Sequence, residues 1–131
     1  MSVVLCNSGP LMTLGKLNRL DLLAELYDEV RVPQAVYNEV VSQGLARGAP
    51  DALIVRLFWQ RQGWPVVEVS PEVLALAQTL TRPLVLLDDE IARAEARRLE
   101  LRVRGTLGVL VQAFRRGALS LSQLFIAALL R

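Results

Sequence analysis

The fold is decided where Leu84-Val85-Leu86-Leu87 runs directly into Asp88-Asp89-Glu90. Four consecutive apolar residues after the break at Arg82-Pro83 predict a buried β-strand. The acidic residues then begin a predicted helix over Asp89–Leu99. A strand that leads immediately into an amphipathic helix is typical of an open parallel α/β sheet.

The same change from a short β-branched run to a small polar residue occurs three more times along the chain. Val3–Cys6 leads into Asn7, Val66–Val69 leads into Ser70, and a run around Val103 leads into Gly105-Thr106. Connections of this length require right-handed crossovers, which place helices on both faces of a parallel sheet. The length of 131 residues predicts a single domain over residues 1–131.

The remaining elements are predicted from the spacing of apolar residues. Helices are expected after Pro10, over Leu20–Tyr27, after Pro33, and over Ala52–Gln62, Val73–Leu80, Leu107–Phe114 and Leu121–Ala128, with a further strand at Val30–Val32. The helix over Ala52–Gln62 is expected to bury the face formed by Leu53, Ile54, Leu57 and Phe58. Gly44 and Gly48 are expected to bracket a loop.

The composition excludes several kinds of site. The chain has no histidine, which excludes imidazole general bases, Ser-His-Asp triads and His-ligated metals. The single Cys6 lies in an apolar run, so we expect a small buried residue rather than a disulfide or a cysteine zinc site. No apolar run approaches the length of a membrane span, and the first residues lack a signal-peptide pattern. This predicts a cytoplasmic protein without membrane contact.

The basic residues are almost all arginine, although the net charge is only +2. Lys16 is the only lysine. Arginine contacts phosphate through two donors at once, which favours a nucleic-acid partner. The alternative is that the arginine content reflects GC-rich coding, because the chain is also rich in alanine, leucine and valine.

Oxygen-bearing side chains follow the ends of the predicted strands. Asn7, Asp88, Asp89 and Thr106 occupy such positions. Ligands of open α/β sheets bind outside the carboxyl ends of the strands, and oxygen ligands suit Mg²⁺ or Mn²⁺. Each residue also has a purely structural interpretation: either aspartate could cap the next helix, Asn7 could organise its turn, and Thr106 could be an N-cap.

Glu39 is a further candidate, on the helix predicted after Pro33. It falls off the apolar stripe formed by Tyr37, Val40 and Val41, so its carboxylate can project into solvent or into a cleft. A solvated surface glutamate is the structural alternative. Glu39 is therefore a candidate site residue only because it lies off the apolar stripe of its helix.

Four ordered motifs of the chain resemble those of PIN-domain proteins. They are Asn7-Ser8-Gly9-Pro10-Leu11 with residues 15–23, then residues 32–40, then Leu86-Leu87-Asp88-Asp89 with Ala92-Arg93, and finally residues 105–110. The similarity is closest to an uncharacterised bacterial and archaeal PIN subfamily that is often encoded beside a small antitoxin. It covers nearly the whole chain.

The resemblance implies a three-layer α/β/α sandwich with a central, mostly parallel sheet. It also implies a divalent-metal-dependent ribonuclease related to VapC-type toxins, with Mg²⁺ or Mn²⁺ as cofactor. In that interpretation Glu39 and Asp88 are catalytic metal ligands, Asn7 and Asp89 assist them, and Arg93 and Thr106 hold the phosphate of the substrate. The implied partners are an RNA substrate, a small antitoxin protein and a second copy of the chain.

The chain departs from the family pattern at two acidic positions. Asn7 stands where most PIN nucleases have an aspartate, and Ser70 stands opposite a family glutamate, with Glu72 two positions further on. Fewer carboxylates weaken the binding of a hard cation. The alternative interpretation is therefore a nuclease-impaired PIN domain that binds RNA or a protein.

The C-terminal stretch over residues 119–130 is apolar around much of its predicted helix. One face of a domain covers only part of such a helix, so we expect self-association or a tight protein partner. A fully buried terminal helix is the alternative. Hydrophobic residues make up 53% of the chain, slightly above the usual fraction, which favours the extra surface contact.

Overall fold

A parallel sheet with the strand order β3-β2-β1-β4-β5 forms the centre of the protein. The computed structural model describes residues 4–68 and 83–130. The strands are β1 (Val4–Cys6), β2 (Val30–Pro33), β3 (Val66–Val67), β4 (Leu84–Leu86) and β5 (Arg102–Arg104). The helix predicted over Val73–Leu80, together with Ser70 and Glu72, lies outside the described residues.

The order of the strands reverses beside the central strand β1. Val4 lies opposite Val30 of β2 on one side and opposite Leu84 of β4 on the other. The chain therefore moves outward through β2 and β3, and then returns to the other side of β1 for β4 and β5. In open α/β sheets, such a reversal leaves a crevice at the carboxyl ends of the two diverging strands. Here that place is the end of β1 and β4.

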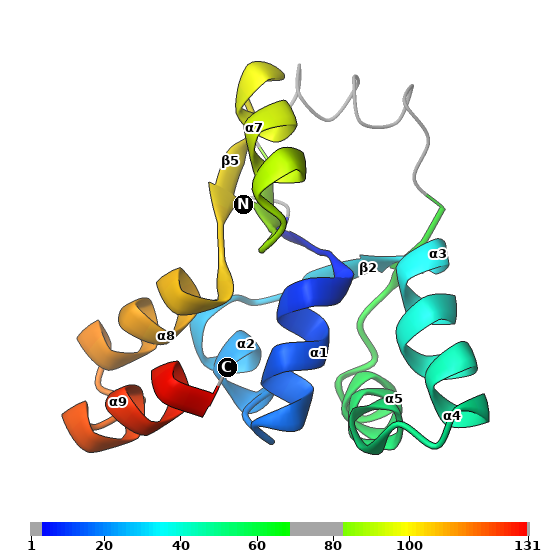
Figure 1. The fold of residues 1–131 in the computed structure, drawn as a ribbon, viewed down its shortest axis with the longest axis horizontal. Coiled ribbons are helices and arrows are strands. Elements are labelled where there is room, and N and C mark those ends of the chain that lie inside the picture. Colours follow the sequence, from blue (N-terminus) through cyan, green and yellow to red (C-terminus); the bar gives the residue numbers. More distant parts are fainter. Residues whose placement is uncertain (1–3, 69–82, 131) are drawn as a thin grey trace.

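Helices surround this sheet, as Figure 1 shows. They are α1 (Ser8–Lys16), α2 (Asp21–Leu26), α3 (Gln34–Tyr37), the π-helical η1 (Asn38–Gln43), α4 (Gly44–Ala46), α5 (Pro50–Gln62), α7 (Glu90–Arg98), α8 (Thr106–Arg115) and α9 (Leu121–Leu130). Alternate strand residues such as Val4, Cys6 and Leu86 are buried in one hydrophobic cluster with residues of α1, α5 and α8. The predicted α/β sandwich with a parallel sheet is confirmed.

The loop predicted between Gly44 and Gly48 is largely helical. The chain continues from α3 through η1 and α4 as far as Ala46. Gly44 has ordinary helical dihedral angles, and a Cβ at this position would lie 2.9 Å from the Cβ of Ala52 in α5. Gly44 therefore serves close packing between two helices, and the predicted loop was wrong at this end, because the turn and packing roles of glycine look alike in sequence. At the other end Gly48, with a φ of 72°, does lie in a turn.

The buried face of α5 agrees with the prediction only in part. Phe58 is buried and Ile54 packs against the core, as predicted, but the two leucines do not. Leu53 and Leu57 are 49% and 52% exposed, whereas Val55 and Trp59 are buried. Trp59 packs edge-to-face against Phe58, with ring centroids 5.7 Å apart, and against Trp64 at 5.4 Å. These aromatic rings bury more apolar area than the leucines, so they determine which side of α5 faces the core.

The terminal helix α9 packs beside α8 (Figure 1) and leaves most of its apolar surface exposed. Phe125 and Leu129 are 65% and 75% exposed, and of the described α9 residues only Ala127 is buried. The alternative of a fully buried terminal helix is therefore wrong for this chain by itself. Within residues 4–68 and 83–130, no helix is both long and apolar enough to cross a membrane.

Candidate functional site

The carboxylate of Asp88 lies just beyond the carboxyl end of β4, at the reversal of strand order. Its Oδ1 accepts a hydrogen bond of 2.7 Å from the backbone N–H of Thr106, and its Oδ2 accepts one of 2.5 Å from the Thr106 hydroxyl. Thr106 is the first residue of α8 and is fully buried. The N-terminus of a helix carries partial positive charge, so it stabilises this carboxylate.

This arrangement corrects one structural interpretation of the sequence. The N-cap of α8 is Gly105, and no side chain caps α8 at that position. The Thr106 hydroxyl instead donates to Asp88 across a separation of 18 residues. Thr106 therefore holds the Asp88 carboxylate in one orientation, and Asp88 in turn satisfies the first N–H of α8.

Two glycines, which have no side chain, make room for the Asp88 side chain. A Cβ at position 9 would lie 3.2 Å from the Cβ of Asp88, and a Cβ at position 105 would lie 3.1 Å from its Oδ1. Gly9 is in the first turn of α1, and Gly105 precedes α8. Both glycines belong to motifs seen in the sequence, but only the structure shows that they allow two helices to approach one carboxylate.

Asn7 lies at the same edge of the sheet, at the end of the neighbouring strand β1. Its backbone N–H donates to the carbonyl oxygen of Leu86 at 3.0 Å, which joins the ends of β1 and β4. Asn7 occupies the N-cap position of α1, but its side chain accepts no cap hydrogen bond from that helix. The half-buried amide is therefore not used as a helix cap, and its position favours a role at the crevice.

Asp89 performs the capping function that the sequence offered as one alternative. Its Oδ1 accepts hydrogen bonds from the backbone N–H groups of Ile91 at 2.8 Å and Ala92 at 3.3 Å, and these bonds cap α7. Both bonds use the same oxygen, so Oδ2 takes no part in the cap. A metal-ligand role for Asp89 stays a prediction.

Glu39 lies on η1, which follows α3 beyond the carboxyl end of β2. It is an exposed residue, and η1 packs against α1 and α5. Among the described residues, no hydrogen bond or ion pair joins Glu39 to Asn7 or Asp88. The structure therefore places Glu39 on the strand-end side of the sheet as an exposed acid, and its predicted role as a ligand remains a prediction.

Arg93 on α7 lies close to Asp88. A Cβ at Gly105 would be 3.6 Å from its Nη1, and Asp88 and Arg93 line the same cleft of about 600 Å³. Its Nη1 is 3.9 Å from a carboxylate oxygen of Glu90, while its buried Nε has no hydrogen-bond partner in the described part of the chain. The guanidinium group therefore retains donors for a ligand.

Cys6 lies beneath this edge of the sheet and is a free, buried thiol, as predicted. Burial raises the pKa of the thiol well above its ordinary value, and the negative charge of Asp88 raises it further. A thiol that stays protonated is a poor nucleophile and a poor metal ligand. Cys6 is therefore part of the core and not of the chemistry.

The side-chain oxygens at this edge are of the type that a hard divalent cation prefers, but together they carry little negative charge. A carboxylate has about four lone-pair sites, and Thr106 uses two of those on Asp88. The remaining lone pairs of Asp88 and the amide oxygen of Asn7 are available, and both are oxygen ligands of the type that Mg²⁺ and Mn²⁺ prefer. Among the described residues, however, no three acidic or cysteine side chains are grouped closely enough to hold a metal ion.

The family DUF3368, described as a PIN domain, matches residues 3–131. The chain belongs to the PIN-domain family. A comparison with curated protein sequences gives no significant match. PIN domains have a nuclease-type fold, and they generally depend on metal ions. The parallel sheet and the acidic side chains after β4 agree with this family.

Proposed function

We propose that this PIN domain is a divalent-metal-dependent ribonuclease of the toxin–antitoxin type, which hydrolyses phosphodiester bonds of RNA. The observation that supports this most is the Asp88 carboxylate, which Thr106 holds with two hydrogen bonds at the reversal of strand order. Parallel α/β sheets bind their ligands at this place. An aspartate held in one orientation with lone pairs left over is suited to bind a cation there.

In this proposal Asp88 and Glu39 are the catalytic metal ligands, and Asn7 and Asp89 assist them. A bound Mg²⁺ or Mn²⁺ would activate a water molecule and stabilise the charge that develops on the phosphate. The Thr106 hydroxyl is buried and already donates to Asp88, so we assign Thr106 to positioning that carboxylate. Contact with the substrate phosphate is then assigned to Arg93, whose guanidinium group has donors to spare.

The second candidate function is a nuclease-impaired PIN domain that binds RNA or a protein. It is favoured by the low charge of the donor set, since Asn7 contributes an amide where a carboxylate would add charge. Only the first candidate predicts cleavage of RNA, whereas the second predicts binding without cleavage. Cleavage of a structured RNA in Mg²⁺ or Mn²⁺ therefore separates them.

Glu39→Gln is expected to reduce this cleavage by about 100-fold or more, because it removes a charged ligand and keeps the size of the side chain. The rate is measured by gel electrophoresis of end-labelled RNA in each metal. Glu25→Gln is the matched control, since Glu25 is an exposed acid on α2. Full activity in Glu39→Gln would remove Glu39 from the site. Absence of cleavage by the unaltered protein would establish the nuclease-impaired alternative.

Metal binding by the free protein is expected to be weak. With an amide at position 7 and few carboxylates nearby, we expect a Kd for Mn²⁺ of about 10⁻⁴ M or weaker. Titration calorimetry without RNA measures this constant, and Asp88→Asn should abolish the signal. Micromolar or tighter binding would show that further charged ligands belong to the site.

We also propose that the protein acts in the cytoplasm and pairs with a small antitoxin and with a second copy of itself. The exposed apolar residues of α9 support a protein contact. Light scattering should show a species larger than the monomer, and Phe125→Glu with Leu129→Glu should convert it to a monomer. Ile91→Glu, at an exposed residue on α7, is the control. A monomer at high concentration, with no partner in its host, would contradict this proposal.

A further inference from the structure

A cleft of about 600 Å³ extends from Asp88 along one side of α8. We name it the arginine cleft; its polar lining residues, apart from Asp88, are Arg93, Arg104, Gln112 and Arg115. Asp88 marks one end, because its carboxylate is bonded to Thr106 at the start of α8. Arg115 marks the other, since α8 has 10 residues and its two ends are about 14 Å apart along the axis.

The sequence of α8 leaves room for this cleft. Gly108, Gln112 and Arg115 are spaced three or four residues apart, so they share one side of the helix. A Cβ at position 108 would lie 2.8 Å from Cγ of Arg104. The glycine therefore allows the stem of Arg104 to lie against α8.

A hydrogen bond to Tyr27 holds the Arg104 side chain in place. Its Nη1 donates a hydrogen bond of 2.7 Å to the hydroxyl oxygen of Tyr27. Burial raises the pKa of Tyr27, although the nearby arginine opposes this. A neutral Tyr27 leaves the charge of Arg104 uncompensated, so the guanidinium group is fixed but still attracts an anion.

The electrostatics of the arginine cleft favour anions. Among the described residues, three arginines line it, and Asp88 is the one acidic residue that does. The buried Nε of Arg93 has no hydrogen-bond partner among the described residues, and an orphaned buried donor is costly unless a ligand or water satisfies it. A concave surface lined mainly by one sign of charge concentrates ligands of the opposite sign.

We propose that the arginine cleft binds the phosphates of single-stranded RNA adjacent to the phosphodiester that faces Asp88. This inference rests on the proposed function, because that function places the reacting bond at Asp88. The planar fork of arginine matches the oxygens of a phosphate, and a cleft as long as α8 exceeds the length of a single phosphate group. The expected ligand is therefore a strand that carries several phosphates.

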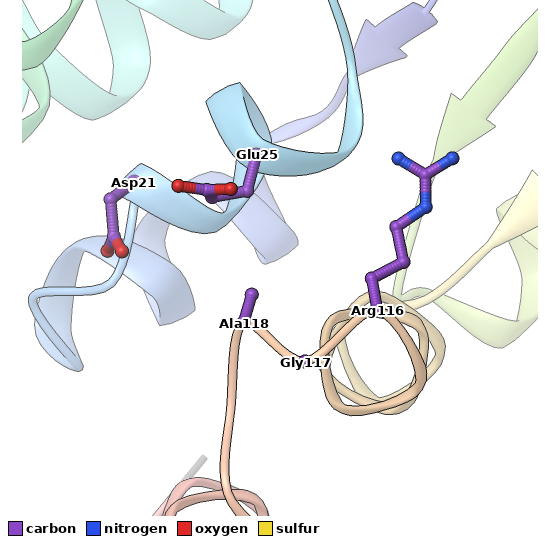
Figure 2. A pocket seen from close by; sticks show the side chains of 5 residues that line it. All are labelled: Asp21, Glu25, Arg116, Gly117 and Ala118. Carbon is purple, nitrogen blue, oxygen red and sulfur yellow. The ribbon is translucent and has the colours of Figure 1, made fainter.

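Figure 2 shows the matched control for this proposal. Arg116 is the next residue after Arg115, but it lines a different pocket of about 440 Å³ together with Asp21 and Glu25 of α2. Both arginines are exposed, so neither substitution removes core packing. Arg115→Gln and Arg116→Gln change the net charge equally, and they remove it from different pockets.

The test is fluorescence anisotropy of a short labelled single-stranded RNA in EDTA, where metal-dependent cleavage does not occur. Arg115→Gln should weaken binding by about three- to tenfold and reduce the slope of log K against log salt by about 0.7 between roughly 50 and 200 mM salt. Arg116→Gln should weaken binding by no more than about twofold, the loss expected from net charge alone, and should leave the slope nearly unchanged. Gly108→Ala, which displaces Arg104, should weaken binding without a change of net charge.

The outcomes separate this inference from the proposed function. Equal losses in Arg115→Gln and Arg116→Gln, or no RNA binding by the unaltered protein, would overturn the arginine cleft as an RNA site even if cleavage were observed. Displacement of the RNA by polyglutamate of equal charge would also overturn it, because the cleft would then accept any acidic chain. Selective loss in Arg115→Gln supports the inference even if the protein cleaves no RNA.

Discussion

Asp88→Asn is expected to reduce metal-dependent RNA cleavage by about 100-fold or more, since several kcal/mol of charge stabilisation depend on this carboxylate. The free energy of unfolding should fall by only about 1–2 kcal/mol, because Asn retains one acceptor for the two Thr106 donors. Cleavage rates and urea denaturation measure the two effects separately. Full cleavage by Asp88→Asn would contradict the proposed site.

Asp89→Asn measures how much Asp89 contributes as an assisting ligand beside Asp88. Asn caps helices about as well as Asp, so the hydrogen bonds to the N–H groups of Ile91 and Ala92 should persist. If Asp89 acts mainly as the cap of α7, its variant should keep most of the activity. A loss as large as that of Asp88→Asn would instead establish Asp89 as an equal ligand.

Leu14→Ala is expected to lower the free energy of unfolding by about 3 kcal/mol. Leu14 lies on α1 with no exposed surface, in the cluster that joins the helices to the sheet. This is a large fraction of the 5–15 kcal/mol that stabilises a typical domain. Denaturation in urea, followed by circular dichroism, measures the change.

Leu57→Ala provides the same chemical change at an exposed position. The sequence predicts Leu57 on the inward face of its helix, but the side chain is 52% exposed. We therefore expect a loss below about 1 kcal/mol. Equal losses of unfolding free energy in Leu14→Ala and Leu57→Ala would mean that another surface covers α5 in solution, or that the buried face assigned to α5 is wrong.

The fold could be predicted because its determinants are local. The short apolar run that begins at Leu84, directly after Arg82-Pro83, favours a strand, and the acids after it are good helix caps. The strand β4 forms there, over Leu84–Leu86. Asp89 indeed caps α7. The alternation of such strands with helices permits few arrangements other than a parallel sheet, and the family relationship to PIN domains is consistent with it.

The candidate site could be predicted only in part. Because parallel strands end at the same edge of a sheet, Asn7 and Asp88 were expected at one edge, and the hydrogen bond from Asn7 to Leu86 joins the ends of their strands there. The hydrogen bonds of Asp88 could not be predicted. Thr106 was assigned to the substrate phosphate, with an N-cap as the alternative, but it donates to Asp88 across 18 residues. Gly9 and Gly105 were seen only as members of motifs.

The sequence alone therefore determined the class of fold, the edge of the sheet that carries the polar side chains, and the absence of histidine chemistry. Only the tertiary structure decided which carboxylate is held in place, which side of α5 is buried, and that Arg93, Arg104 and Arg115 line one cleft. The physical reason is the range of the interactions. Strand propensity and helix caps depend on neighbours in the sequence, whereas packing and electrostatic contacts depend on residues that only the folded chain brings together.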